Sequence, residues 1–211
     1  MCKTLRARWT IIPTIAPQPW IVCGGCGGLR AFRSSGKIRL NANGRKLDAW
    51  LIYKCLVCES TWNRPIFERR NLRDIDPMIL DALQSNDPDW VRAETFNLDA
   101  LRRKSQRVDE FAECDIAKEI RHETAGWTSL EIELLVPFPT NTRLDRLLAS
   151  ELKMSRSRLQ ALHQQGVCRM EPNRADIMRR RIRNGTLVMI DLATEAEREH
   201  FWKALATGAP L

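Results

Sequence analysis

Four cysteines occur as two Cys-x-x-Cys pairs, and their spacing is the clearest sign of chemistry in the sequence. Cys23 and Cys26 lie in "CGGC", and Cys55 and Cys58 lie in "CLVC" after an interval of 28 residues. Two such pairs can supply the four thiolates of a tetrahedral zinc site, because each tight turn directs two sulfurs at one metal ion. Four cysteine ligands leave zinc no open position for a substrate, so the spacing predicts a structural zinc ion. The alternative is a disulfide or redox pair, which a cytoplasmic setting disfavours.

The residues between and after the cysteine pairs predict the strands that position them. Residues 37–41 and 47–53 flank Asn43-Gly44, a strong hairpin-turn signal, and residues 62–69 form a third strand. The pattern resembles a zinc ribbon over about residues 8–70. A module this short has little core of its own, so we expect the metal to supply much of its folding energy. The other three cysteines are expected to be structural or incidental: Cys2, Cys114 and Cys168.

A second group of chemically informative residues lies near the carboxyl end, in "MSRSRLQALHQQG" and "MRRRIRNG". The first run predicts a helix capped by Ser155 and ended by Gly166, with Arg156 and Arg158 at its start. Cations are disfavoured there because the helix dipole is already positive at that end. An anionic ligand would explain them, since guanidinium groups and backbone amides then converge on one anion. The alternative is a solvated basic face.

The elements around these arginines form a short α and β unit. Leu144, Leu147, Leu148 and Leu152 make one apolar stripe on a preceding helix. Strands are expected at 167–171, 177–183 and 186–192. On the middle strand Arg179, Arg181 and Arg183 would share one face. Residues 141–192 hold 11 basic and 5 acidic side chains, which favours a polyanionic partner.

This unit resembles the small RNA-binding domain named after a small-subunit ribosomal protein, hereafter the S-four domain. The resemblance rests on Arg143-Leu144-Asp145, Ser155-Arg156-Ser157, Gly166-Val167 and the run from Arg183 to Val188. It covers residues 141–192 and implies two helices packed on a small antiparallel sheet. It also implies binding of structured RNA, especially ribosomal or transfer RNA.

The resemblance further implies that Arg143, Lys153 and Arg156 face phosphates, beside the polar face of the second helix. Arg158 stands where the family usually has an acidic residue, and residues 170–173 replace its Asn-Gly after the first strand. The candidate RNA-binding residues are Arg143, Lys153, Arg156, Arg158, Gln160, Arg179, Arg181 and Arg183.

Charge divides the chain into two cationic ends and an anionic middle. Residues 1–73 hold 14 basic and 3 acidic side chains, whereas residues 74–133 hold 7 basic and 15 acidic ones. Aromatic residues accompany the cations of the first region, where they either stack on bases or form a small core. The middle predicts a helix ending near Asn86, a short helix capped by Asn97, and a hairpin over 114–136. We expect this middle region to be scaffold.

These patterns predict an α+β protein with four regions: a zinc-ribbon β module (1–73), a mixed α/β connection (74–140), an S-four-like domain (141–192), and a C-terminal helix and tail (193–211). No apolar run is long enough to span a membrane, so a cytoplasmic protein is expected. The run from Asn41 through "LDAWLIYKCLVCESTWN" also resembles an uncharacterised bacterial family known only as a domain of unknown function.

The predicted function is non-catalytic binding of structured RNA or the ribosome through the S-four-like domain and the basic ribbon. We expect no enzyme activity, because the sequence has no P-loop, dinucleotide fingerprint or nucleophile constellation. Two alternatives stay open. One is an RNA-modifying enzyme or its accessory, and the other is an adaptor that binds proteins with a degenerate S-four fold. Protein partners are compatible with the sequence, which does not specify an oligomeric state.

Overall fold

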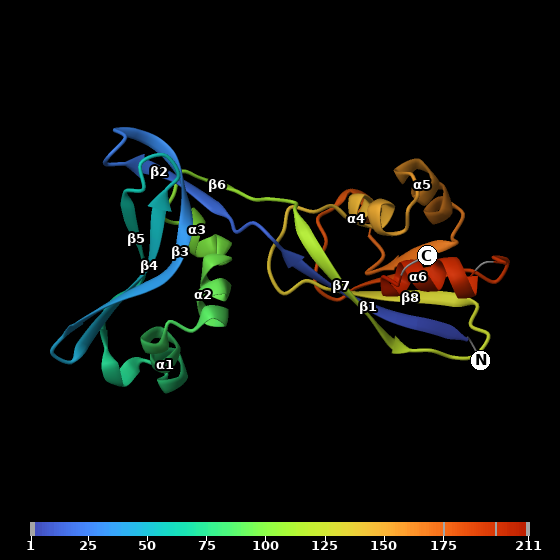
Figure 1. Cartoon of the computed structure of the whole chain (residues 1–211), viewed down its shortest axis with the longest axis horizontal. Coiled ribbons are helices and arrows are strands. Elements are labelled where there is room, and N and C mark those ends of the chain that lie inside the picture. Colours follow the sequence, from blue (N-terminus) through green and yellow to red (C-terminus); the bar gives the residue numbers. More distant parts are fainter. Residues whose placement is uncertain (1–2, 175, 197, 210–211) are drawn as a thin grey trace. The chain divides into compact units, whose positions relative to one another are not determined.

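The computed structural model describes residues 3–174, 176–196 and 198–209, which form two compact units (Figure 1). Unit 1 comprises Met1–Ile15 and Phe111–Leu211, and unit 2 comprises Ala16–Glu110. Each unit has its own five-stranded sheet and its own helices, which confirms the α+β class. The expected boundaries at residues 73, 140 and 192 differ from this grouping, because the chain leaves unit 1 after residue 15 and returns to it at residue 111. Cys2 lies outside the described residues.

The sheet of unit 1 is built around the amino-terminal strand. Its strands lie in the order β7-β1-β8-β10-β9. They are β1 (Thr4–Pro13), β7 (Cys114–His122), β8 (Ser129–Leu135), β9 (Cys168–Glu171) and β10 (Thr186–Asp191). Strand β1 pairs antiparallel with β7 and parallel with β8. The expected hairpin over 114–136 is therefore wrong, since β1 lies between its two arms. The parallel pair brings together two alternating apolar strands, whose buried residues include Trp9 and Leu134.

One face of this sheet is covered by helices that continue the apolar core. These are α4 (Leu144–Glu151), α5 (Arg156–Gln164) and, near the carboxyl end, η3 (Arg198–Trp202) and α6 (Lys203–Thr207). The two expected helices of the S-four-like region are confirmed as α4 and α5. Ser155 caps α5 by accepting a hydrogen bond from the Arg158 amide, and Gly166 follows the helix at a φ of 75°. Arg143 occupies the N-cap position of α4 and makes no side-chain capping hydrogen bond there.

The expected strand over residues 177–183 is wrong. A 3-10 turn, η2 (Ile177–Arg179), takes its first part, and the rest makes only an isolated bridge between Arg143 and Arg181. Ile177 and Met178 are neighbours and both are buried, which a strand with alternating faces cannot achieve. A common strand face for Arg179, Arg181 and Arg183 is therefore excluded.

The sheet of unit 2 confirms the expected three-stranded core. Its order is β5-β4-β3-β2-β6. The strands are β2 (Gln18–Cys23), β3 (Gly28–Asn43), β4 (Lys46–Cys55), β5 (Thr61–Asn71) and β6 (Arg107–Asp109). The β3–β4 turn has Gly44 at a φ of 60°, and all residues from 41 to 46 are exposed, so the turn projects as an arm (Figure 1). Residues 8–13 of the ribbon resemblance belong instead to β1 of unit 1.

Three helices follow β5 and the short turn η1 (Leu72–Asp74) in unit 2. They are α1 (Pro77–Ser85), α2 (Pro88–Thr95) and α3 (Leu98–Arg102). The sequence prediction included α1 and α3 but missed α2. Yet Asp87-Pro88 repeats the Asp76-Pro77 start of α1, with an aspartate cap followed by proline at the first helical position. This local pattern was sufficient to find α2.

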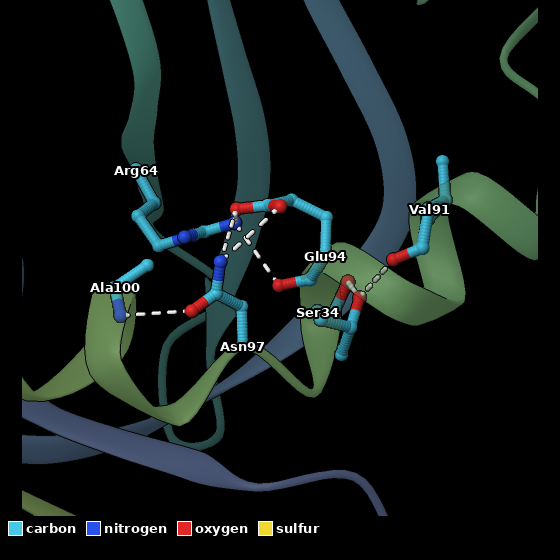
Figure 2. A network of polar contacts seen from close by, with 7 residues as sticks. Ser34, Arg64, Val91, Glu94, Asn97 and Ala100 are labelled. Atoms are coloured by element: carbon cyan, nitrogen blue, oxygen red, sulfur yellow. Dashed lines mark hydrogen bonds and ion pairs between the residues drawn. The ribbon is translucent and has the colours of Figure 1, made fainter. Parts of the chain in front are cut away.

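A buried ion pair fastens these helices to the sheet (Figure 2). The Arg64 side chain on β5 is fully buried, and its Nη2 donates to the carbonyl oxygen of Glu94 at 3.1 Å and to Glu94 Oε1 at 2.7 Å. Asn97 donates to the same carboxylate and caps α3 by accepting from the Ala100 amide. Arg64 Nε and Nη1 are buried and have no hydrogen-bond partner among the described residues. Arg64 is a brace between β5 and the α2–α3 connection.

Candidate functional site

The four predicted metal ligands come together in unit 2. The sulfur atoms of Cys23, Cys26, Cys55 and Cys58 all lie within 4.8 Å of one another. The Sγ atoms of Cys23 and Cys58 are 3.4 Å apart, and those of Cys26 and Cys55 are 3.9 Å apart. A tetrahedral ion with metal–sulfur bonds of about 2.3 Å spaces its sulfurs by about 3.8 Å, so the cluster has the dimensions of a four-thiolate site. Both distances far exceed a disulfide bond of about 2.05 Å.

Each cysteine pair sits on the same kind of turn. Gly27 donates its amide to the Cys23 carbonyl at 2.9 Å, and Glu59 donates its amide to the Cys55 carbonyl at 3.1 Å. Both residues have a positive φ, 68° for Gly27 and 58° for Glu59. Glycine adopts this conformation freely, while Glu59 carries the cost of an L residue there and pairs with Arg33 at 3.0 Å. Each of the two matching turns contributes two sulfurs to the cluster.

Gly25 makes room for the sulfur atoms. A Cβ at this position would lie 2.4 Å from the Ser60 hydroxyl oxygen and 3.1 Å from Cys58 Sγ. Any larger residue would displace one or both of these groups. Ser60, whose Oγ lies 3.1 Å from Cys58 Sγ, was not predicted from the sequence to belong to this site. No feature of the sequence beyond its closeness to Cys58 marks this serine.

The surroundings of the cysteines favour thiolates at two positions. Hydrogen bonds with the Ser60 side chain and amide lower the pKa of Cys58 to about 6. The Cys26 amide, by hydrogen bonding, lowers the pKa of Cys23. The pKa of Cys26 is raised to about 12, chiefly by its hydrogen bond with the Cys58 sulfur. A cation bound among the four sulfurs would relieve the mutual repulsion of their thiolates, so this donor set fits a soft divalent metal ion.

The eight candidate RNA-binding residues, hereafter the basic platform, all belong to unit 1 and are all exposed. Three of them line one hollow of about 220 Å³: Arg156 and Gln160 from α5, and Arg179 from η2. The first two lie one helical turn apart on α5, as the sequence predicted. Arg179 reaches the hollow because the segment after β9 folds back as a 3-10 turn. The structure therefore brings these three candidates together.

The other five residues of the basic platform lie at separate positions in unit 1. Lys153 and Arg158 line a second hollow, of about 270 Å³, together with Phe201 and Trp202. The Arg143 guanidinium forms two hydrogen bonds to Asp145, at 3.1 and 2.6 Å. The bridge from Arg143 brings Arg181 beside the start of α4. Arg183 is exposed next to the turn before β10, where its carbonyl accepts from Thr186.

A family model described as "Protein of unknown function (DUF1062)" matches residues 40–174, which is more than half of the chain. The chain belongs to the DUF1062 family. The match includes Cys55 and Cys58 as well as α4 and α5, and it ends before η2. No curated protein and no solved structure matches the chain. Among the residues that the structure describes, no helix is both long enough and apolar enough to cross a membrane.

The hollow in this DUF1062 protein is also lined by residues that were not predicted from the sequence to belong to it. Asp145, Asp176 and His163 line it beside the two arginines. His163 also lies 2.9 Å from the Cys168 carbonyl through its Nδ1. Helical spacing from Gln160 could have placed His163 there, whereas Asp176 reaches the hollow only through the η2 turn. Two arginines and two aspartates provide both donors and acceptors, which suits a polar ligand with a charged group.

Proposed function

We propose that this protein is a non-catalytic RNA-binding protein whose basic platform contacts the phosphate backbone of structured RNA, ribosomal or transfer RNA. The observation that carries the proposal is the convergence of Arg156, Gln160 and Arg179 on one hollow of unit 1. Arg156 is the first residue of α5, where the helix dipole disfavours a cation unless an anion is present. A phosphate there would be held by both guanidinium groups and the free amides of the first turn.

The local electrostatics support this reading. Within the described residues, no ion pair is found for Arg156, Arg158 or Arg179. Arg143, by contrast, is oriented by Asp145. The resemblance to the S-four domain also supports RNA binding. Two helices (α4 and α5), a strand (β9) and a basic segment follow one another in the chain order that the resemblance implies. RNA would be read by shape and phosphate position, because such contacts carry no base identity.

We further propose that the four cysteines hold a structural zinc ion. All four protein ligands would be used, so the ion would stabilise unit 2 and leave no position for a substrate. A reducing compartment keeps thiolates available for the metal, and the proposal accordingly puts the protein in the cytoplasm. Unit 2 would add a second RNA contact at its arm and the neighbouring end of β5. The exposed cations there come from the β3–β4 turn, β4, β5 and η1: Arg45, Lys46, Arg69, Arg70 and Arg73.

The test is the salt dependence of RNA binding. Replacing Arg156 and Arg179 by alanine removes two phosphate contacts, so the slope of log affinity against log salt should flatten by about 1.5. The matched control is Arg6→Ala with Arg121→Ala, which removes two exposed arginines of unit 1 outside the platform. Transfer RNA and a ribosomal RNA fragment serve as probes in a filter-binding assay. An unchanged slope in the platform variant, or equal flattening in the control, would overturn the proposal.

A further inference from the structure

Unit 2 has an apolar groove on the outer side of its first two helices. The groove has a volume of about 620 Å³ and lies between α1 and α2. Met78 and Ile79 form its rim, with exposed fractions of 82% and 39%, and Trp90 of α2 forms its wall. The small side chains of Ala82 and Ser85 also line it. α1 therefore has two apolar faces, since Leu83 already packs inward.

This face is unusual for a solvent-exposed helix. Met78, Ile79 and Ala82 lie within about one turn of α1 and line the same groove, so these apolar side chains are grouped and not scattered. An exposed apolar patch bordered by charges is typical of a surface that is covered by a partner. Methionine is flexible and polarizable, so Met78 can adapt to a partner side chain at small cost.

The charge around the groove specifies the occupant. Residues 74–99 contain seven acidic side chains and one arginine, in a chain whose net charge is +8. Asp81 lies on the groove itself and its carboxylate is exposed. Asp76 and Asp87 line the groove while capping α1 and α2. Such a border repels nucleic acid and anionic membranes and attracts cations.

We propose that the α1–α2 groove docks a cationic amphipathic helix of a partner protein. The apolar face of that helix would cover Met78, Ile79 and Trp90, and its lysine or arginine residues would face the aspartates. A second copy of this chain does not fit. In the described residues the cationic helix α5 already buries its apolar side through Leu159, and α4 does so through Leu147 and Leu148. The proposal is independent of RNA binding, since it uses neither the basic platform nor the arm.

A synthetic helix made only of leucine and lysine, with the leucines on one face and a fluorescent label, is the probe. Its binding to RNase-treated full-length protein is followed by fluorescence anisotropy. We expect saturable binding that weakens with salt. Met78→Lys and Asp81→Lys should each weaken it by about tenfold or more, because one blocks the apolar rim and the other reverses a bordering charge. Both residues are exposed, so neither change should unfold the protein.

Two matched variants in unit 1 are the controls. Ile120→Lys replaces an exposed apolar residue and Asp115→Lys reverses an exposed charge, and both should bind the probe as the parent does. A leucine–glutamate peptide of the same pattern should not bind. The proposal is overturned if the groove variants bind like the parent, if the controls lose binding equally, or if the acidic peptide binds as well. It is also overturned if Met78→Lys converts a dimer to a monomer, since a second copy would then occupy the groove.

Discussion

The two units of this molecule are stabilised by different means. In the described part of unit 1, 24 buried residues form one apolar cluster that includes Trp9, Trp127 and Trp202. The corresponding cluster of unit 2 contains 7 buried residues, two of which are the metal-ligand candidates Cys23 and Cys55. Apolar burial stabilises by about 25 cal/mol for each Å² removed from water, so unit 1 has much the larger hydrophobic contribution. A unit with so small a core needs other constraints.

Unit 2 has two such constraints, and they lie at different places in its fold. The cysteine cluster joins the turn between β2 and β3 to the turn between β4 and β5. The Arg64–Glu94 pair fastens β5 to the helices. The arm at the other end of β3 and β4 is exposed and contributes little burial. One chain thus combines a unit with a large apolar core and a unit whose small core is accompanied by a cysteine cluster and a buried ion pair.

Metal removal should produce the largest difference in stability between the two units. Structural zinc sites contribute about 10–16 kcal/mol of binding free energy, far more than a core of this size can replace. A chelator, or Cys26→Ser with Cys55→Ser, should abolish hydrogen-exchange protection in β3, β4 and β5 of unit 2. Protection in β1 and β8 of unit 1 should persist. Equal protection of both units without metal would contradict the assignment of a structural metal site.

Trp9→Ala should have the opposite effect and destabilise unit 1 while unit 2 stays folded. Trp9 is fully buried, its Nε1 donates to the Ala206 carbonyl at 2.8 Å, and the Lys118 ammonium lies 4.5 Å from its ring centroid. Removing a buried tryptophan costs about 3–5 kcal/mol. Urea unfolding followed by hydrogen exchange should show this loss in unit 1, with metal content unchanged. Loss of the metal in this variant would show that the units do not fold separately.

Local signals in the sequence were sufficient for much of unit 2. The Cys-x-x-Cys spacing identified the four clustered sulfurs, because each turn is formed by adjacent residues. Asn43-Gly44 identified the β3–β4 turn, and the cap Asn97 identified the start of α3. These features depend on a few neighbouring residues, so propensity and capping rules apply directly.

Features formed by distant residues could not be predicted in this way. Strand β1 enters the sheet of unit 1 more than 100 residues before its partners β7 and β8, and nothing within its own sequence identifies them. For the same reason, the grouping of the basic platform residues in unit 1 was predicted only in part. Arg156 and Gln160 share a helix face, but Arg179 joins them through the η2 turn, and Lys153 and Arg158 line another hollow.

The brace in unit 2 gives a smaller effect than the Trp9 change. Glu94→Ala leaves the fully buried Arg64 guanidinium without its ion-pair partner, and breaking a buried pair costs about 3–5 kcal/mol. The Glu94 side chain is 18% exposed, so we expect about 3 kcal/mol or slightly less. Denaturant unfolding of the metal-loaded protein measures this change. Glu94→Ala combined with Arg64→Met should recover part of the loss, whereas a strictly additive result would mean that the pair is not coupled.

The smallest expected effect comes from Tyr53, which is the only tyrosine in the chain and is fully buried in unit 2. Burial raises the pKa of this phenol to about 12, from a usual value of about 10. Because the folded pKa is the higher one, the contribution of Tyr53 to stability is complete below about pH 10 and is lost as pH rises toward 12. Tyrosinate absorbance should therefore titrate near pH 12 in the metal-loaded protein. It should return to about pH 10 when the metal is removed, because unit 2 then opens while unit 1 stays folded. A phenol that still titrates near 12 without metal would mean that the small core of unit 2 holds its own fold, and the contrast between the two units would disappear.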